Sequence, residues 1–387
     1  MILIAEPVHF GDTHVQVNAA LVSMICTAMP KHKIKLVAEN GHIAALKTKS
    51  GDSLENIELQ NFKKYNFGRN FFWVQKIFGE WKTIFKVLKT AKREKPELLV
   101  WLSLFPTGHL MLHLTRLFFP RSQKHLIVLH GEMEYLSGNS SKWQDRFLSG
   151  ALKMAFKLSD AFTTYLFLSD AAKRNFETSK IETKSQLFSI LHPFIYSDTL
   201  VKKPLFPPIK VVLFGALQQA KNVNAFYELA EHFADKVKEQ KLSFITLGKM
   251  NPELQVQANA WVQMYKPDEF IPQEELEEQL SQCHLALFFY NSSMYRWSAS
   301  GAILEAINQN VPVITFENEY FREILTLNKV GVAVENIKEM HGQINLMLAN
   351  PADYLSAYNP EISSFIQQNS FLLQTQKIKS ILNMALV

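Results

Sequence analysis

SGAILEAINQNVPVITFENEYFREI, residues 300–324, is the stretch that decides the fold. It predicts a turn, a short helix, a strand and the start of a second helix. Ile303, Leu304 and Ile307 form an apolar helix face that can anchor in a core. The following Pro-Val-Ile-Thr-Phe run, 312–316, has the continuous apolar character of a strand buried on both faces. The stretch therefore predicts one unit of a layered α/β domain.

Another face of the same helix could bind a nucleotide. Gly301, Glu305 and Asn308 are spaced at i, i+4 and i+7 and share that face. The first N–H groups of a helix are unpaired and its dipole is positive there, so they attract anions. A carboxylate one turn further along could accept hydrogen bonds from hydroxyls such as those of a ribose. The alternative is an ordinary helix–strand unit whose Glu305 points into solvent, and the spacing alone leaves both interpretations open.

Bulk composition indicates a globular chain of two domains. The chain has 387 residues, of which 47% are apolar and 20% charged, and single cores rarely grow beyond about 250–300 residues. It begins MILIAEP, a strand without a basic leader, so we expect no signal peptide. The apolar region 98–119 is interrupted by proline, glycine, histidine and arginine, which favours a buried strand and helix over a membrane span. Cys26 and Cys283 lie far apart, which predicts reduced core thiols in a cytosolic protein.

Basic residues concentrate in one part of the first half. Residues 61–125 contain 13 Lys and Arg against 3 Asp and Glu, a net +10, so the remainder of this +5 chain sums to −5. Large aromatic residues share the expected helix 70–95 with these lysines. Such a helix can lie on an anionic membrane surface, or it can pack its aromatic face on its own sheet. The aromatic and basic segment 114–124 favours the membrane. We expect no nucleic-acid partner, because no helix-turn-helix, zinc module or RNA-binding signature is present.

The order of expected elements predicts two Rossmann-like, doubly wound α/β domains. The first domain is expected over residues 1–203, the second over 204–360, and a C-terminal helix over 361–387 should pack back on the first domain. Three prolines in KKPLFPPIK, 202–210, indicate the linker. The expected strands cover residues 2–5, 33–39, 55–62, 97–103, 125–130, 161–168, 186–191, 210–214, 242–247 and 285–289. The expected helices include 15–29, 107–118, 141–158, 224–238 and 273–282, and residues 337–387 should be mostly helical.

Polar residues that directly follow apolar strands are the site candidates of the first half. Ligands of such sheets bind at the carboxyl ends of strands. The loop after the first strand holds His9, Asp12 and His14, and the loop after strand 125–130 holds His130 and Glu132. His130 is the stronger candidate because it closes a very apolar strand. Simple solvation of the loop histidines is the alternative for His9 and His14.

The expected first strands lack the fingerprints of two large enzyme classes. No G-x-G-x-x-G follows either one, and the chain contains no P-loop. Dinucleotide oxidoreductases and P-loop NTPases are therefore poorly supported. A cleft between two such domains is the default binding site.

Two motifs of the second half resemble those of GT-B fold glycosyltransferases, closest to the retaining family 4, the glycosyl transferases group 1. That family carries G-R-L-x-x-x-K-G after the first strand of its second domain, where this chain has Gly215-Ala-Leu-Gln-Gln-Ala-Lys221-Asn. It also carries E-G-F-G-x-x-x-x-E-A and then P-V-I. Here the corresponding residues run from Trp297 through Gly301 to Glu305-Ala, followed by Pro-Val-Ile at 312–314. The resemblance covers nearly the whole chain in layout and is specific in the second half.

The resemblance implies roles for individual residues. Lys221, beside Gly215, would neutralise the donor diphosphate, and backbone N–H groups around Ser300, Gly301 and Ala302 would cradle it. Glu305 would accept hydrogen bonds from the ribose. His130 resembles a position that touches the transferred sugar, so we assign catalysis to His130 and Asp12 and the acceptor side to His9, His14 and Glu132. The family implies a hexosyltransferase-like enzyme with no cofactor and no bound metal, because protein groups stabilise the leaving diphosphate.

Two departures bear on activity. Ala216 replaces the family's arginine, and Trp297 replaces the first glutamate, which the family places against the donor sugar. Tyr295, Arg296 and Arg322 could supply compensating contacts. A catalytically weak relative that binds a nucleotide or glycan as a regulatory or assembly partner is therefore the alternative function. An epimerase is a further alternative, and a phosphorylase is disfavoured by the absence of a pyridoxal lysine motif.

The leading hypothesis is a glycosyltransferase that uses a nucleotide-sugar. Its acceptor would be a saccharide or a lipid-linked precursor of cell-surface polysaccharide or lipopolysaccharide. The basic aromatic region 61–125 predicts a cytoplasmic protein that is peripheral at the inner face of the cell membrane.

Overall fold

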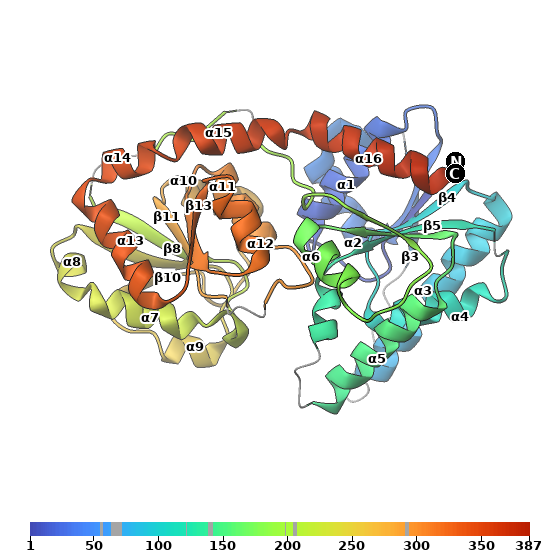
Figure 1. The fold of residues 1–387 in the computed structure, drawn as a ribbon, viewed down its shortest axis with the longest axis horizontal. Helices are drawn as coiled ribbons and strands as arrows, with labels where there is room; N and C mark the ends of the chain where they lie inside the picture. The colour runs from blue at the N-terminus through green and yellow to red at the C-terminus, as the bar shows by residue number, and fades with distance from the viewer. Residues whose placement is uncertain are drawn as a thin grey trace. The chain divides into compact units, whose positions relative to one another are not determined.

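The computed structural model describes residues 1–54, 57–62, 72–120, 122–137, 142–197, 199–203, 207–290 and 294–387, with only the backbone of residues 52, 53, 72–76 and 220. The chain divides into two compact units, each built on one sheet (Figure 1). Unit 1 comprises Met1–Ile195, Tyr295–Ala299 and Phe371–Val387, and unit 2 comprises Tyr196–Met294 and Ser300–Ser370. The division falls at Ile195, ahead of the expected boundary at 203, and linker residues 204–206 lie outside the described residues.

Unit 1 is a parallel sheet covered on both faces. The sheet order is β3-β2-β1-β4-β5-β6-β7, and every pair is parallel. Strands buried on both faces need continuous apolar runs, and ILIA of β1 and LLVW of β4 are completely buried. The strands are β1 (Ile2–Ala5), β2 (Ile34–Glu39), β3 (Glu58–Phe62), β4 (Leu98–Trp101), β5 (Lys124–Leu129), β6 (Thr163–Phe167) and β7 (Gln186–Ser189).

The helices of unit 1 form two layers, because successive strand residues point to opposite faces. Ile2 and Ile4 share a core with α1 and α16, whereas Leu3 and Ala5 share another with α3, α4 and α5. Figure 1 shows α16, red, beside α1 on one face. The helices are α1 (Val15–Ala28), α2 (Asn40–Ser50), α3 (Phe72–Glu94), α4 (Pro106–Arg116), α5 (Trp143–Leu158), α6 (Asp170–Glu177) and α16 (Phe371–Leu386).

Unit 2 repeats the plan with a six-stranded parallel sheet of order β10-β9-β8-β11-β12-β13. Its strands are β8 (Ile209–Phe214), β9 (Leu242–Leu247), β10 (Val262–Tyr265), β11 (Leu285–Phe288), β12 (Val313–Phe316) and β13 (Gly331–Val334). Its helices are α7 (Val223–His232), α8 (Ala234–Lys238), α9 (Pro252–Val256), α10 (Gln273–Ser281), α11 (Gly301–Asn308), α12 (Glu319–Phe321), α13 (Ile337–Ala349), α14 (Pro351–Ser356) and α15 (Asn359–Gln368).

Each sheet has one point where the strand order reverses. In unit 1 the chain builds β1, β2 and β3 in one direction and then returns to place β4 on the other side of β1. In unit 2 it builds β8, β9 and β10 and then places β11 on the other side of β8. Loops diverge at such a switch point and leave a crevice at the carboxyl ends of the two strands. The switch points therefore lie beside β1 and β4 in unit 1 and beside β8 and β11 in unit 2.

The expected elements differ from the observed ones in a few places. The expected helix 224–238 is two helices, α7 and α8, separated at Phe233, whose backbone leaves the helical region at φ −103° and ψ 16°. Helix α2 and strands β10 and β13 were not among the expected elements. Helix α2 starts with Asn-Gly-His and gains its N-terminal cap from Glu39, whose side chain accepts from the N–H of His42. The expected strand 55–62 is β3, and its first two residues lie outside the described part.

Candidate functional site

Two glycine turns lie close together at the carboxyl ends of β8 and β9, next to the switch point of unit 2. Gly215 follows β8 with φ +102°, and Gly248 follows β9 with φ +111°, a conformation that L side chains rarely adopt. A Cβ added at Gly248 would lie 2.6 Å from the carbonyl oxygen of Gly215. Gly215 N–H donates to Leu247 O over 3.0 Å, which ties the two strand ends together. The sequence motif predicted Gly215 here, and Gly248 was not among the predicted site residues.

Lys221 places its ammonium group directly over this glycine turn. Its Nζ lies 3.4 Å from the position that a Cβ at Gly215 would occupy, and 5.9 Å from the ring centre of Tyr290, just beyond β11. Burial lowers the pKa of Lys221 to about 8. The described residues provide no carboxylate in ion-pair distance of Lys221. A cation held beside glycine backbone at the carboxyl end of a parallel strand can attract an anion.

Helix α11 and its N-terminus lie in the same unit. Ile303, Leu304 and Ile307 are completely buried, which confirms the anchoring face. The Glu305 side chain is only 6% exposed, so the interpretation in which it points into solvent is wrong. Ser300 N–H donates to the hydroxyl of Tyr320 over 3.0 Å.

Fewer backbone N–H groups are therefore available to an anion at the start of α11 than the motif suggests. The Ser300 amide is already bonded to Tyr320, so it cannot also serve an anion. The first-turn amides of Gly301 and Ala302 have no acceptor within the helix, as in any α-helix. Arg322, expected as a compensating contact, is bound through Nε to Glu317 over 2.6 Å. That ion pair occupies the guanidinium group of Arg322.

The switch point of unit 1 is organised by a buried carboxylate, Glu6, directly after β1. It accepts hydrogen bonds from Val8 N at 2.8 Å, His9 N at 3.0 Å and Asn18 Nδ2 at 2.8 Å, and from the Ser103 hydroxyl. Burial raises the pKa of Glu6 to about 7, and the hydrogen bonds oppose this shift. Glu6 thus shapes the loop that carries His9, although it was not a predicted site residue.

The end of β2 holds the tip of the same loop. His42 Nδ1 donates to Gly11 O over 2.8 Å, so its Nε2 accepts from Asn18 Nδ2 over 3.1 Å. The Glu39 carboxylate accepts from Gly11 N–H and His42 N–H. Asp12, at the exposed tip, is presented to solvent by this framework.

Three predicted histidines come together in unit 1. The rings of His9 and His14 stack with centres 3.9 Å apart, and His14 meets His130 edge-on at 5.5 Å. His14 is exposed on one side, but desolvation by the protein atoms crowded around its ring, together with the nearby His130 and His42, lowers its pKa, and Glu132 opposes this. His192, at the end of β7, also acts electrostatically on His14 and His130, and it was not predicted.

The orientation of the His130 ring is fixed by its partners. Nε2 lies 2.7 Å from Leu102 O, and a carbonyl oxygen can only accept, so Nε2 carries the proton. His130 N–H donates to Glu132 Oε1 over 2.9 Å, and that oxygen lies 3.5 Å from His109 Nε2. Burial lowers the pKa of His130, so the neutral ring presents Nδ1 as an acceptor. The Glu132 carboxylate therefore holds the backbone of His130 in place through this hydrogen bond.

Trp297, which replaces a carboxylate in the motif, is a core residue of unit 1. It is 5% exposed and belongs to the same apolar cluster as Met133 and Leu136. Its backbone N–H donates to Glu134 Oε1 over 3.0 Å, and Asn175 Nδ2 donates to Arg296 O over 2.9 Å. Tyr295 and Arg296 thus belong to unit 1, whereas Lys221 and Glu305 belong to unit 2.

Among the described residues, neither a metal-binding cluster nor a membrane-spanning helix is present. Within that part of the chain, no three His, Cys, Asp or Glu side chains are grouped to hold a metal ion. Across the same ranges, no helix combines the length and apolar character that crossing a bilayer requires.

Comparison with known proteins agrees with the motifs. Residues 208–350 match the family model of glycosyl transferases group 1. No curated protein matches the chain. Among solved structures, the chain is similar to HepE from Anabaena in complex with UDP and glucose, with 13% identity over 99% of this chain and 100% of that chain and a TM-score of 0.70. It is also similar to WaaG, a glycosyltransferase involved in lipopolysaccharide biosynthesis, with 12% identity over 98% and 99% and a TM-score of 0.65.

A glycosyltransferase from Rickettsia africae is a third similar structure, with 11% identity, 100% and 98% coverage and a TM-score of 0.63. At these identities the likeness is one of fold, and it confirms the expected GT-B architecture. The family match over 208–350 confirms the resemblance of the second half to glycosyl transferases group 1.

Proposed function

We propose that this chain, whose residues 208–350 match glycosyl transferases group 1, moves a sugar from a nucleotide-sugar to a saccharide or lipid-linked acceptor. The observation that carries the proposal is the Lys221 ammonium group over the Gly215 turn, at the switch point of a domain of that family. Cell-surface polysaccharide or lipopolysaccharide synthesis is the proposed context, supported by the fold shared with WaaG.

In the donor site, Lys221 binds the diphosphate of the nucleotide-sugar. Negative charge on the diphosphate grows as the bond to the sugar breaks, so a fixed ammonium group stabilises the transition state more than the ground state. The first-turn amides of Gly301 and Ala302 add hydrogen bonds, and Glu305 accepts from the ribose hydroxyls. Because Lys221 supplies the positive charge, the reaction needs no cofactor and no divalent metal. Excess EDTA should therefore leave the rate of transfer unchanged, and a loss restored by Mg²⁺ would contradict this step.

In unit 1, His130 is proposed to contact the transferred sugar. Its Nδ1 can accept a hydrogen bond from a sugar hydroxyl, since Nε2–H is committed to Leu102 O. Asp12 is the proposed proton acceptor for the incoming hydroxyl, supported by its exposed position at a loop tip that His42 and Glu39 hold in place. His9, His14 and Glu132 complete the acceptor side. These roles use the carboxyl ends of β1 and β5, where ligands of α/β sheets bind.

The proposed location is the cytoplasmic face of the cell membrane. In α3 the residues that pack on the sheet are Ile84, Val87 and Leu88, whereas Phe78 and Phe85 are 53% and 43% exposed. These two aromatic residues therefore do not cover the sheet, and lysines alternate with them along the helix. Phe71, Lys63, Lys64 and Arg69 of the predicted surface lie outside the described residues. Exposed aromatic rings among lysines are suited to an anionic bilayer surface.

The second candidate function is that of a catalytically weak relative, which binds a nucleotide or glycan as a regulatory or assembly partner. Trp297 is buried in the core of unit 1 and has no carboxylate, so the contact that the family makes to the donor sugar has no counterpart at this position. Ala216 likewise lacks the second phosphate cation. The missing carboxylate at Trp297 concerns the sugar and not the nucleotide, so it would reduce transfer more than nucleotide binding.

The decisive experiment measures nucleotide release from UDP-, GDP- and dTDP-sugars with lipid-linked saccharide acceptors, in the parent, Lys221→Ala and Glu305→Ala. Both variants should lose turnover, while Lys249→Ala, an exposed lysine of unit 2, should not. Turnover that survives in both variants would show that the site assignment is wrong. Calorimetric nucleotide binding without any transfer would favour the second candidate.

Flotation with liposomes tests the location separately. Binding to anionic vesicles at low salt, weakened by added salt, is expected because screening reduces attraction between exposed charges. Failure to float at low salt would remove the membrane part of the proposal and leave the transfer reaction untouched.

A further inference from the structure

A cavity lies in unit 1, away from the proposed site. Its volume is about 510 Å³. It opens at the amino-terminal edge of the sheet, because its lining includes Pro96 and Glu97 just before β4 and Gln123 to His125 at the start of β5. The proposed sugar-transfer residues follow the carboxyl ends of the strands, at the opposite edge. The proposed sugar transfer therefore does not use this cavity.

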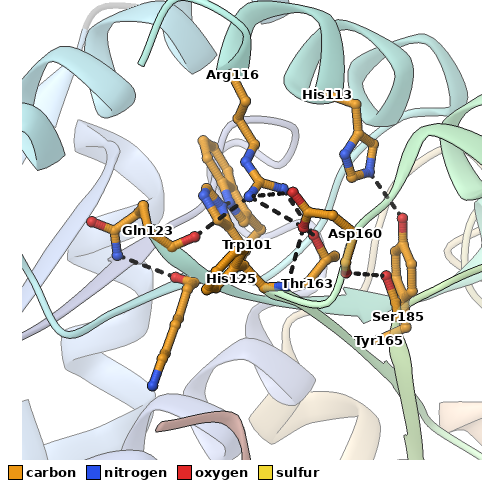
Figure 2. A network of polar contacts seen from close by, with 11 residues as sticks. Trp101, His113, Arg116, Gln123, His125, Asp160, Thr163, Tyr165 and Ser185 are labelled. Atoms are coloured by element: carbon orange, nitrogen blue, oxygen red, sulfur yellow. Dashed lines mark hydrogen bonds and ion pairs between the residues drawn. The ribbon is translucent and has the colours of Figure 1, made fainter. Parts of the chain in front are cut away.

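One wall is a fixed polar network, shown in Figure 2. Arg116 donates to Thr163 over 2.8 Å and to the Asp160 carboxylate over 3.2 Å. Gln123 Nε2 donates to Pro96 O over 3.0 Å, which joins the start of β5 to the residue that precedes β4. These bonds hold the wall rigid, so the cavity is preformed.

His125 contributes a buried donor to this wall. The Trp101 indole N–H donates to His125 Nδ1 over 3.0 Å (Figure 2). Indole nitrogen can only donate, so Nδ1 must be unprotonated and the proton of the neutral ring sits on Nε2. The side chain is 1% exposed and lines the cavity, and Nε2 has no hydrogen-bond partner in the described part of the chain. A buried N–H donor without an acceptor is uncommon, and an incoming oxygen would satisfy it.

The rim of the cavity is cationic. Lys92 and Lys95, at the end of α3, are exposed, and neither has an ion pair within the described ranges. Lys124 donates to the Leu386 carbonyl, so it also faces the cavity. The Glu97 carboxylate is bound to the amino group of Met1, which offsets its charge. The local excess of positive charge favours an anion.

Lys95 is an unusual residue for its backbone conformation. Its φ is +49°, and its N–H donates to Ala91 O over 2.8 Å, so it closes α3 in the left-handed position where glycine is preferred. Glycine would end the helix there without strain, but it would remove the ammonium group from the rim. The charge is thus retained at the expense of local strain.

An apolar surface adjoins the cations. Leu88, Phe119 and Leu386 line the cavity, and Phe119 meets the exposed Phe85 ring at 5.7 Å. Phe85 continues to Trp81 at 6.3 Å and Trp81 to Phe78 at 6.4 Å, so an aromatic row leads from the protein surface to the cavity.

We propose that this cavity binds a phosphate group, with its oxygens on Lys92, Lys95 and the Nε2–H of His125. The carrier of the phosphate is either the head of an anionic lipid, whose chains would follow the aromatic row, or a free soluble phosphate. This site is separate from sugar transfer and does not depend on it.

The test is calorimetric titration of the full chain at low salt with three probes. They are dihexanoyl phosphatidic acid below its micelle concentration, inorganic phosphate, and dihexanoyl phosphatidylcholine as the lipid without net charge. The double variant Lys92→Gln/Lys95→Gly should bind phosphatidic acid at least tenfold more weakly than the parent. Lys89→Gln removes a charge from the same helix outside the cavity lining and should bind as the parent does. Lys95→Gly also relieves the left-handed strain, so the thermal unfolding midpoint should not fall, which separates lost binding from lost folding.

The probes distinguish the two sources. Phosphatidic acid that binds tenfold or more tightly than inorganic phosphate, with loss in the double variant, supports a lipid head. Equal binding of the two phosphates, lost in the double variant, supports a soluble phosphate. Unchanged binding in the double variant, or equal binding of phosphatidylcholine, overturns the proposal. Nucleotide binding at Lys221 should be unaffected in the double variant, so failure here and failure of the proposed function remain separable.

Discussion

Replacing Lys221 with methionine should stabilise the protein while it weakens nucleotide binding. Methionine has a similar volume and no charge. Burial lowers the pKa of Lys221 to about 8, against an ordinary lysine value near 10.4. Each unit corresponds to about 1.4 kcal/mol, so the buried ammonium group costs the folded state about 3 kcal/mol near pH 7. The variant loses the attraction to the Tyr290 ring, about 0.5–1 kcal/mol. A net gain of about 2–3 kcal/mol in the free energy of unfolding remains.

The pH dependence gives the sign of this effect independently. A lysine whose folded pKa is lowered destabilises the fold wherever it is charged, and this cost disappears as the pH rises from about 8 toward its unfolded pKa. The stability difference between Lys221→Met and the parent should therefore be largest below pH 8 and shrink above it. Urea unfolding of both proteins at a series of pH values measures it. Lys249→Met, at an exposed position, is the control and should stay within about 0.5 kcal/mol of the parent.

Nucleotide binding should change in the opposite direction. Hydrogen bonds to charged groups contribute about 1.5–3 kcal/mol, so Lys221→Met should weaken nucleoside diphosphate binding about 10- to 150-fold. Calorimetry measures the affinity, and the shift in thermal midpoint on adding nucleotide should shrink in parallel. A variant that is less stable than the parent and binds nucleotide equally well would refute both the burial cost and the phosphate role. The two measurements together separate a functional lysine from a structural one.

Two further predictions concern the switch points. Gly248→Ala should lower the free energy of unfolding, measured by urea unfolding, by about 2–4 kcal/mol. Its φ is +111°, and the new Cβ would lie 2.6 Å from Gly215 O. The control Gly150→Ala, inside α5 with no atom within 4 Å of a new Cβ, should instead raise the free energy of unfolding by about 0.5–1 kcal/mol. Glu6→Gln should flatten the pH dependence of stability between about pH 4.5 and 7. The raised pKa of Glu6 means that the folded protein binds the extra proton in this window, so parent stability falls by about 2–3 kcal/mol as pH rises through it. A parent whose stability rises relative to the variant across that window would exclude a protonated Glu6.

The layered fold could be predicted because its evidence is local. Apolar runs such as ILIA and LLVW identify strands buried on both faces, and the intervening amphipathic segments identify helices. The place of Lys221 after the first strand of the second sheet was also predictable, since a motif specifies the spacing. The spacing left the burial of Glu305 open, and only the packed structure decides it. Helix α2 was missed because its helical signal is weak and its cap, Glu39, lies on the preceding strand.

The details of the sites depend on contacts that spacing does not encode. Tyr320 reaches back twenty residues to take the Ser300 amide, which removes one donor from the expected cradle. Glu6 collects donors from three separate segments of unit 1, and only the fold brings Ser103 to it. Trp297 stands in the motif position of a carboxylate, yet its burial in the core of unit 1 is set by tertiary packing.

The two switch points differ in chemistry in a way that matches the two halves of the proposed substrates. In unit 2 the groups at the switch point are glycine backbone and one ammonium group, Lys221, a combination suited to a diphosphate. In unit 1 the corresponding place holds carboxylates and neutral imidazoles, such as Glu6 and His130, which can exchange hydrogen bonds with sugar hydroxyls but would repel or fail to neutralise a phosphate. In the proposed function, the same strand topology serves twice, once for charge stabilisation in unit 2 and once for hydroxyl recognition in unit 1. Replacing the ammonium group with a carboxylate in Lys221→Glu should therefore abolish nucleotide binding and leave the hydrogen-bond network of Glu6 intact.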